Sequence, residues 1–324
     1  FVHYLYQKYG WDALVNISHD YGDEVLPFGI NKVARRHLNG KGYVAAYKKW
    51  LKRLKRRFSA TTRLVKKRGL RQGKKITKTG ETAFYPHFHP RGRKVVFMES
   101  DGHGEQAFKT IPARGGKKTK LTRVESGGAS SWTPDGESLV FSQMEVHKAV
   151  YTYSDLFRWD LTAKKIVRLT QGLRAREPDV SPDGRKIAFT VNRLGQRCLA
   201  VMKFNRNTEV TPVRRKTPKR KGGMRLLWCG KARDQAFTPS WSPDSKRIVF
   251  SAWTSGGYRD LYLIDPATKK LERLTRDRAL DTNPTWSPDG RWIYFASDRT
   301  SIYNIYALNL ENKQTYQVTN VLTG

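Results

Sequence analysis

The sequence has few cysteines, no long apolar run and none of the common hydrolase motifs. Its two cysteines, Cys198 and Cys229, match no metal-binding spacing, and neither a disulfide nor a cytosolic location follows from them. No run of about 18 apolar residues occurs, which excludes a membrane-spanning helix in this chain. Neither H-E-x-x-H nor G-x-S-x-G is present. We therefore predict no catalytic residues in this chain.

Histidines with metal-binding spacing are also lacking. His3, His19 and His37 do not stand at i, i+4, so each is interpreted as a surface or packing residue. His87 and His89 alternate on an expected strand and could face one side together, but no third ligand accompanies them. The sequence predicts no metal site.

Acidic residues are scarce. The chain has 28 Asp and Glu against 62 Lys and Arg, a net charge of +34, which favours polyanionic neighbours such as nucleic acid, an acidic membrane surface or an acidic polysaccharide. Residues 51–80 contain thirteen basic side chains and no acidic one, and residues 214–221 form a second cluster in an expected inserted loop. Outside these clusters the charges are scattered, so a generally basic, solvated surface is the simpler interpretation.

A tight turn of the type Ser-Pro-Asp-Gly recurs along the chain. In residues 287–290, the proline presets φ at the first central position and the glycine supplies a positive φ, so that two strands continue antiparallel. The prolines of successive copies lie 44, 48, 61 and 45 residues apart. The copies are residues 89–92, 133–136, 181–184, 242–245 and 287–290.

The same β-rich pattern follows each turn. A strand such as residues 292–295 comes first, a third strand such as 260–265 follows in several copies, and a fourth ends in a pair such as Leu274-Thr275. A period in the forties with four strands per copy indicates a β-propeller, and its regularity disfavours a β-sandwich with coincidental turns. The predicted fold class is mainly β, a propeller of four-stranded blades with a small N-terminal α-helical segment. Five blades are visible, and six or more are implied because the chain stops where the next blade should begin.

These copies resemble the WD-like repeats of the TolB-type propeller family, whose signature is P-x-W-S-P-D-G followed by I-x-F, D-I-Y and L-T. The resemblance covers about residues 74–324 and is most specific in the last two copies. Arg91 replaces the Asp of the first turn and Ser245 the Gly of the fourth, so those copies are expected to be less regular. The resemblance implies a periplasmic or cell-envelope location.

Residues 1–58 have a helical pattern unlike the rest. We expect one helix closed by Gly10, a second ending near Gly22, a third stopped after Leu38, and a fourth with an apolar stripe that begins at Tyr43. Three segments of this part resemble the C-terminal helical tail of gluzincin-type metallopeptidase domains. They are FVHYLYQKYGWDAL, LPFGINKV and GKGYVAAYKKWLKRLKRRF. That resemblance places any zinc site upstream of this chain, which lacks an initial Met and is expected to be a fragment with an undetermined export signal.

Three domains are therefore predicted. Residues 1–58 form the tail of a peptidase-like domain, residues 59–73 a basic linker, and residues 74–324 a propeller that is incomplete at its C-terminal end. Ile76 and Thr77 are expected in an outermost strand that completes the last blade.

The candidate ligand-binding residues come from segments that enter the mouth of the central channel, where loops of every blade converge. They combine aromatic, amide and charged groups, which suits a protein or peptide ligand. No cofactor is expected in this chain. The candidates are Phe84, Tyr85, Arg176, Glu177, Gln235, Phe237, Asp281, Thr282 and Asn283.

Three functions stay open at this point. The favoured one is a non-catalytic envelope propeller that binds protein or peptide and is attached to a metallopeptidase-like domain. The second is an active zinc metallopeptidase whose propeller filters substrate. The third is a basic nucleic-acid-binding protein, which we expect least. Contact of the basic linker and loop with an anionic surface is compatible with the first two.

Overall fold

The structure is a computed structural model, and it describes residues 1–323 except 26–27, 78–81, 101, 103, 148 and 206–222. The chain divides into two compact units, Phe1–Leu70 and Arg71–Gly324. None of the helices found in these residues has the length and apolar character needed to span a bilayer. The second basic cluster, residues 214–221, lies outside the described residues.

The first unit consists of three helices, α1 (Val2–Gly22), α2 (Ile30–His37) and α3 (Tyr43–Lys67). Gly10 has φ 82° and ψ 172° and divides α1 into two helical segments, as the sequence predicts. An apolar cluster that includes Leu5, Val33 and Leu38 holds the helices together. Helix α3 continues through residues 59–67, so this part of the predicted linker is helical, and no Gly or Pro interrupts the stretch before Gly69.

The second unit contains twenty described strands that form four-stranded antiparallel blades. Blades 3 and 4 are joined by one parallel bridge between Arg197 and Gln235. Blade 1 is β1 (Thr82–Phe88), β2 (Lys94–Ser100), β3 (Ala107–Pro112) and β4 (Thr119–Arg123). Blade 2 is β5 (Ser130–Trp132), β6 (Ser138–His147), β7 (Tyr151–Asp160) and β8 (Lys165–Arg168). Blade 3 is β9 (Ala175–Val180), β10 (Lys186–Arg193), β11 (Gln196–Lys203) and β12 (Arg225–Trp228). Blade 4 is β13 (Gln235–Trp241), β14 (Ile248–Trp253), β15 (Arg259–Ile264) and β16 (Leu271–Arg273). Blade 5 is β17 (Thr282–Trp286), β18 (Trp292–Ser297), β19 (Asn304–Asn309) and β20 (Thr315–Gln317).

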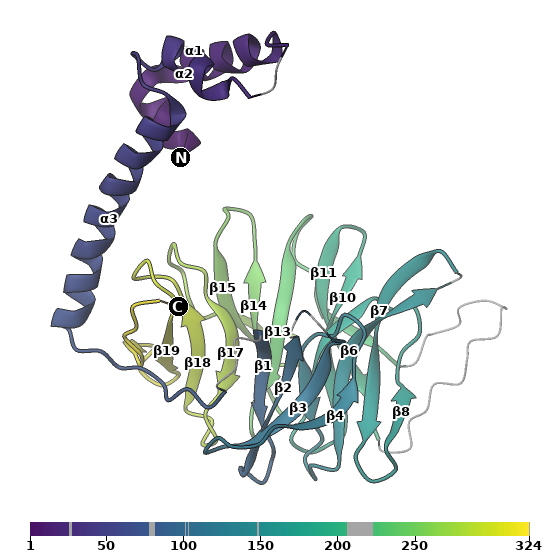
Figure 1. The fold of residues 1–324 in the computed structure, drawn as a ribbon. Helices are drawn as coiled ribbons and strands as arrows, with labels where there is room; N and C mark the ends of the chain where they lie inside the picture. The colour runs from purple at the N-terminus through teal and green to yellow at the C-terminus, as the bar shows by residue number, and fades with distance from the viewer. Residues whose placement is uncertain are drawn as a thin grey trace. The chain divides into compact units, whose positions relative to one another are not determined.

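The blades follow one another in chain order, and their inner strands contact in the series β1, β5, β9, β13, β17 (Figure 1). Apolar clusters fill the space between neighbouring blades, and the Trp that precedes the turn in blades 2, 4 and 5 packs against the preceding blade, as Trp132 and Trp241 do. Phe88 holds the same position in blade 1 but is 67% exposed, whereas Trp132 is 7% exposed. The predicted propeller of four-stranded blades is confirmed.

The repeated turn is held by one set of hydrogen bonds. In the third copy, Ser181 Oγ donates to Asp183 Oδ1 at 2.5 Å, the amide of Lys186 donates to Ser181 Oγ at 2.9 Å, and Gly184 has φ 70°. The fourth copy keeps this arrangement with Ser245 at φ 59°. We expected the Ser in place of Gly to make this turn less regular, and the structure shows that it does not. Asp and Ser side chains thus specify this turn more strongly than the glycine does.

A second repeated contact locks the outer strands. In the third strand of blade 2, Asp155 Oδ1 accepts a hydrogen bond from Thr170 Oγ1 at 2.8 Å, and Thr170 Oγ1 accepts one from the amide of Leu156 at 2.9 Å. Asp260 with Thr275, and Asn304 with Thr319, repeat the pattern. The first residue of the D-I-Y motif and the Thr of the L-T motif are therefore joined by hydrogen bonds within each of these blades.

The segment before β1 pairs with the end of blade 5, but not where expected. Arg71 exchanges backbone hydrogen bonds of 3.1 and 2.9 Å with Asn320. Ile76 belongs to no strand and packs instead on Val95, Phe97 and Ile111 of blade 1. Ile76 and Thr77 therefore lie in no strand, whereas an outermost strand was expected, since the apolar side chain of Ile76 packs on the core of blade 1.

Cys198 and Cys229 form a disulfide, a pairing that the sequence left open. Cys198 lies in β11 and is buried, and Cys229 follows β12. The bond links the third strand of blade 3 to the end of its fourth strand, and the two cysteines are 31 residues apart in the sequence.

Candidate functional site

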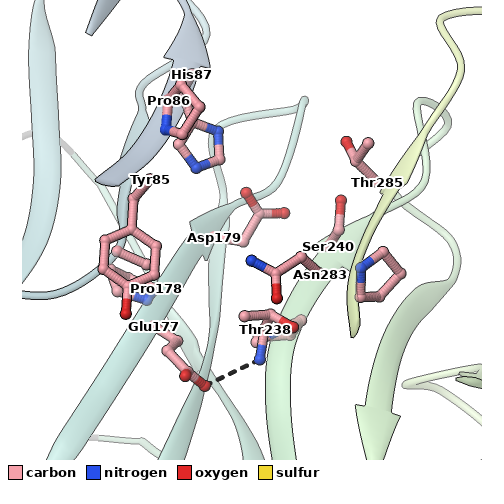
Figure 2. A pocket seen from close by; sticks show the side chains of 13 residues that line it. Tyr85, Pro86, His87, Glu177, Pro178, Asp179, Thr238, Ser240, Asn283 and Thr285 are labelled. Atoms are coloured by element: carbon pink, nitrogen blue, oxygen red, sulfur yellow. Dashed lines mark hydrogen bonds between the residues drawn. The ribbon is translucent and has the colours of Figure 1, made fainter. Parts of the chain in front are cut away.

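A cavity of about 250 Å³ lies between the inner strands, and every blade contributes to its wall (Figure 2). Two positions of each inner strand provide most of the lining. The first is a bulge residue, and the second stands two residues later, immediately before the conserved place of the inter-blade Trp. The bulge residues are Tyr85, Glu177, Thr238 and Asn283, Ala129 holds the matching place directly before β5 of blade 2, and the later ones include His87, Asp179, Ser240 and Thr285.

The bulges arise from local sequence. Tyr85, Glu177, Thr238 and Asn283 have φ values of 51°, 53°, 44° and 53°, and a proline follows each of them. Strand pairing shifts register at these places in four of the blades. A bulge redirects side chains, and strained backbone of this kind gathers at functional sites. The side chains at the bulge positions therefore face the central channel and differ from blade to blade, whereas the strand and turn pattern of the repeat is kept.

Asp179 is the acidic side chain deepest in this cavity. Its Oδ2 accepts a hydrogen bond from the amide of Trp241 at 2.7 Å, and its Oδ1 accepts one from Ser131 Oγ at 3.0 Å. The residue retains some accessible surface towards the cavity, but protein atoms surround it, and this burial raises the pKa of Asp179 to about 6 against the two hydrogen bonds, which lower it. A carboxyl group at the centre of the cavity can thus change protonation state near neutral pH.

His87 and His89 do not share a site. His87 lines the cavity with an exposed side chain, and desolvation by the surrounding protein atoms lowers the pKa of its imidazole. His89 instead packs on Trp132, with ring centroids 4.8 Å apart, and its Nε2 lies 3.1 Å from the carbonyl oxygen of Gly136. Among the described residues, no group of three or more His, Cys, Asp or Glu is arranged to hold a metal ion.

Glu177 is the centre of a polar cluster at the mouth. Its Oε2 accepts hydrogen bonds from the amide of Thr238 at 2.9 Å, drawn in Figure 2, and from Thr190 Oγ1 at 3.2 Å. Its Oε1 lies 3.6 Å from Arg197 Nη1. The neighbouring Tyr85 is half-buried, and burial followed by the nearby charge of Glu177 raises the pKa of its phenol.

Arg176 lines a smaller cavity of about 100 Å³ that shares Tyr85 and Glu177 with the central one. Its Nε donates to Ser154 Oγ at 3.1 Å. Phe237 lies under two guanidinium groups, with Arg259 Cζ 3.9 Å and Arg197 Cζ 4.6 Å from the ring centroid. Both predicted residues therefore lie near the mouth, although Phe237 does not line the central cavity.

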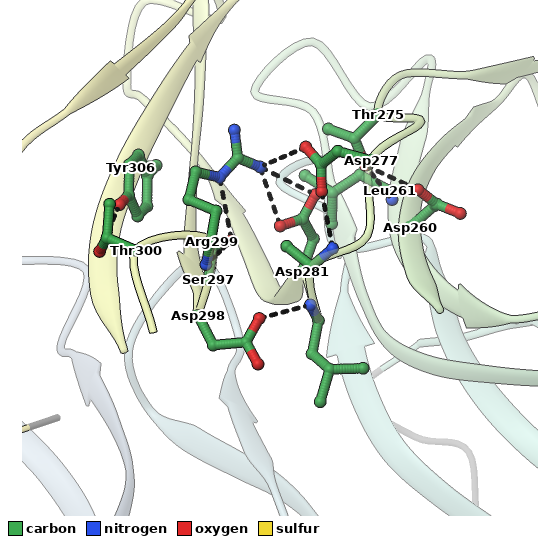
Figure 3. A network of polar contacts seen from close by, with 12 residues as sticks. Asp260, Leu261, Thr275, Asp277, Asp281, Ser297, Asp298, Arg299, Thr300 and Tyr306 are labelled. Carbon is green, nitrogen blue, oxygen red and sulfur yellow. Dashed lines mark hydrogen bonds and ion pairs between the residues drawn. The ribbon is translucent and has the colours of Figure 1, made fainter. Parts of the chain in front are cut away.

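Asp281 differs from expectation. Its side chain is fully buried, and its carboxylate accepts hydrogen bonds from Arg299 Nη2 at 2.9 and 3.1 Å (Figure 3). Burial, ahead of these favourable contacts, raises the pKa of Asp281. Arg299 also reaches Asp277 at 3.1 Å. Asp281 is therefore a structural residue that ties loops of blades 4 and 5, and the prediction that it meets a ligand is not supported.

The remaining candidates lie at the edge of the site. Thr282 Oγ1 donates within blade 5 to the carbonyl of Ala296 at 3.4 Å, and Gln235 pairs with Arg197 and Trp253 through its backbone. Phe84 is 43% exposed beside Tyr85. Of the nine predicted residues, Tyr85, Glu177 and Asn283 line the central cavity, and Arg176 joins Tyr85 and Glu177 in the adjoining one.

Sequence reasoning missed Asp179, Ser240, Thr285 and Arg259. The signal for the first three was available, because they stand directly before the Trp position of the repeat, and strand alternation turns that position away from the Trp. Arg259 had no such signal, since it comes from the third strand and reaches the mouth only through tertiary packing.

Comparison with known proteins agrees with this fold. Residues 223–321 match the family model described as the TolB beta propeller domain. The Tol-Pal system protein TolB of Francisella tularensis is 38% identical over 87 residues, which is 25% of this chain and 19% of that protein. The uncharacterized peptidase YuxL of Bacillus subtilis is 26% identical over 210 residues, which is 56% of this chain and 31% of that protein.

Among solved structures, TolB from Acinetobacter baumannii superposes with a TM-score of 0.59 at 21% identity, covering 75% of this chain and 56% of that one. The chain thus spans about a fifth of the length of the first curated relatives it matches. The chain carries a β-propeller, of which residues 223–321 match the TolB beta propeller domain, and its likeness to the solved structure, at this identity, shows the fold alone.

Proposed function

We propose that this propeller is a non-catalytic module that binds a protein or peptide segment at the mouth of its central channel. The observation that carries the proposal is the cavity of about 250 Å³ to which all five blades contribute, four of them through bulged inner strands. Its wall mixes proline, tyrosine, amide and carboxyl groups, which suits an extended polypeptide with both apolar and hydrogen-bonding parts. The residues that line the cavity differ from blade to blade, whereas the tight turns and the hydrogen bonds between the third-strand Asp or Asn and the following Thr recur.

The bacterial cell envelope is the proposed location. Relatives named as Tol-Pal system proteins support it. The disulfide between Cys198 and Cys229 fits an oxidising compartment, because disulfides persist outside the reducing cytosol.

Attachment to a metallopeptidase-like domain is the third part of the proposal. It rests on the resemblance of the helical unit, α1 to α3, to a gluzincin tail. Any zinc would belong to that upstream domain, and the propeller would then present or filter polypeptide for it.

The proposal can be tested by selecting peptides from a displayed random library on the whole chain and measuring their affinity by calorimetry. Thr285 is exposed towards the cavity at an extended strand position, so Thr285→Trp places an indole in the channel without backbone strain. Selected peptides should bind this variant at least about tenfold more weakly. Thr119→Trp, on the exposed outermost strand of blade 1, is the matched control and should bind as the parent does. Equal binding to the parent and to Thr285→Trp would refute a channel-mouth site.

A further inference from the structure

The mouth of the channel carries more positive than negative charge. Arg197 Nη1 lies 3.6 Å from Glu177 Oε1, and Arg176, Arg197 and Arg259 all act electrostatically on the phenol of the neighbouring Tyr85. Arg259 and Arg197 both lie over the ring of Phe237, at 3.9 and 4.6 Å from its centroid. An aromatic face holds guanidinium groups in place and leaves their edges free to donate hydrogen bonds.

The three arginines are not equally satisfied. Arg197 has Glu177 Oε1 at 3.6 Å and donates from Nε to Asn192 Oδ1 at 3.3 Å. Arg176 donates to Ser154, and its Nη2 lies 3.4 Å from Met144 Sδ. Arg259 donates only from Nε, to Ser251 Oγ at 2.9 Å, and no carboxylate of the described residues lies within 4 Å of it.

Other arginines at the blade edges differ in this respect. Arg168 lies 3.2 Å from Asp155, Arg273 lies 2.6 Å from Asp260, and Arg299 lies 2.9 Å from Asp281. Arg259 is likewise partly buried, and burial, together with the charge of Arg197, lowers its pKa to about 10. A deep guanidinium without a carboxylate is costly, and it becomes favourable when an anion arrives.

We propose that the cluster of Arg259, Phe237 and Arg197 binds a carboxylate of the polypeptide that enters the channel mouth. This inference rests on the proposed function and adds the chemical group that the mouth selects. A carboxylate is planar and accepts two parallel hydrogen bonds from the two terminal nitrogens of Arg259, which the protein leaves unused. The Phe237 ring excludes water from one side of the pair, and the phenols of Tyr85 and Tyr303 lie within electrostatic range of Arg259.

The carboxylate can come from an Asp or Glu side chain or from a C-terminus. Four short glycine peptides separate these sources. One has blocked ends and a central Glu, the second has Gln in its place, the third is all glycine with a free C-terminus, and the fourth is its amide. Each is titrated into the whole chain at physiological salt, and binding is followed by the NMR signals of the arginine Nε–H groups.

The Glu peptide or the free-carboxylate peptide should bind and shift the Arg259 signal, whereas the Gln and amide partners should not. Arg259→Gln and Arg197→Gln should each weaken binding at least about tenfold, since a hydrogen bond to a charged group is lost. Arg259→Lys should bind with intermediate affinity, because the charge stays and the fork is lost. Arg91→Gln removes one exposed charge at the turn beyond the other end of β1, and it should bind within about twofold of the parent.

Equal affinity of the parent and Arg259→Gln would overturn the inference, and so would equal binding of the Glu and Gln peptides or no binding of either carboxylate peptide. If library-selected peptides are blocked by Thr285→Trp but ignore Arg259→Gln, the carboxylate site is wrong and the channel-mouth function stands. If a carboxylate peptide binds at Arg259 while no library peptide is sensitive to Thr285→Trp, the proposed function fails and the anion site remains. Should Arg259→Gln fold poorly, Arg197→Gln and Phe237→Leu give the same comparison.

Discussion

Removal of the Asp155 carboxylate should destabilise the propeller more than loss of any exposed ion pair. Asp155 is 1% exposed and accepts four hydrogen bonds, from Thr170 Oγ1 at 2.8 Å, Arg168 Nη2 at 3.2 Å, and the amides of Gly172 at 2.7 Å and Leu173 at 3.1 Å. Asp155→Ala leaves these donors without their acceptor. Each unmet buried donor costs about 1–3 kcal/mol, and Arg168 recovers part of its share from water because its side chain is 33% exposed.

The expected loss for Asp155→Ala is therefore about 3–5 kcal/mol. Asp155→Asn keeps one acceptor oxygen but turns an amide donor towards Gly172 and Arg168, so about 2–3 kcal/mol is expected. Asp260, at the same repeat position in blade 4, binds only Arg273 and Thr275 among the described residues, and Asp260→Ala should cost less than Asp155→Ala.

Urea unfolding of the whole chain, followed by circular dichroism of the β-structure, measures these losses. Glu272→Gln is the matched control, because Glu272 forms an exposed 2.7 Å pair with Lys313 and its loss should cost less than about 1 kcal/mol. The reasoning is refuted if Asp155→Ala costs no more than Glu272→Gln, or if Asp260→Ala costs more than Asp155→Ala.

Two further predictions concern the cavity and the helical unit. The pKa of Asp179 is about 6 in the folded protein and 3.8 in the unfolded chain, so the folded protein binds this proton more tightly. The contribution of this proton to the free energy of unfolding is therefore complete below about pH 4 and is lost as the pH rises through 6. Asp179→Asn should therefore gain in melting temperature relative to the parent as pH rises from 4 to 7, and a constant difference across this window would contradict the burial argument. Gly10 sits at φ 82° with no atom near its would-be Cβ, so Gly10→Ala should cost about 1–2 kcal/mol through the backbone alone and speed amide exchange in α1 about tenfold. Gly22→Ala, at the end of the same helix and equally open, should slow that exchange or leave it unchanged, and the opposite order would show that packing governs Gly10.

Local sequence determined much of the scaffold. Proline, Asp and Gly at residues 287–290 and their copies dictate a tight turn, and alternation after each turn dictates a strand, since both depend on neighbours in the chain. The period of the copies then predicts a propeller without knowledge of any contact. Gly10 as the break in α1 is of the same kind, because only the backbone conformation at that residue is involved.

Tertiary structure decided which side chains face the axis. Asp281, Thr282 and Asn283 are adjacent in sequence, yet Asp281 is buried against Arg299 while Asn283 lines the cavity. The side chains of Asp281 and Asn283 point in different directions because β17 has a bulge at this place. Arg259 meets Phe237 from another strand of blade 4 and Arg197 from blade 3, and Cys198 pairs with Cys229 beyond the neighbouring strand. Such meetings depend on the register and packing of blades that are distant in the chain, so the repeat identifies the fold while the packing of its blades makes the site.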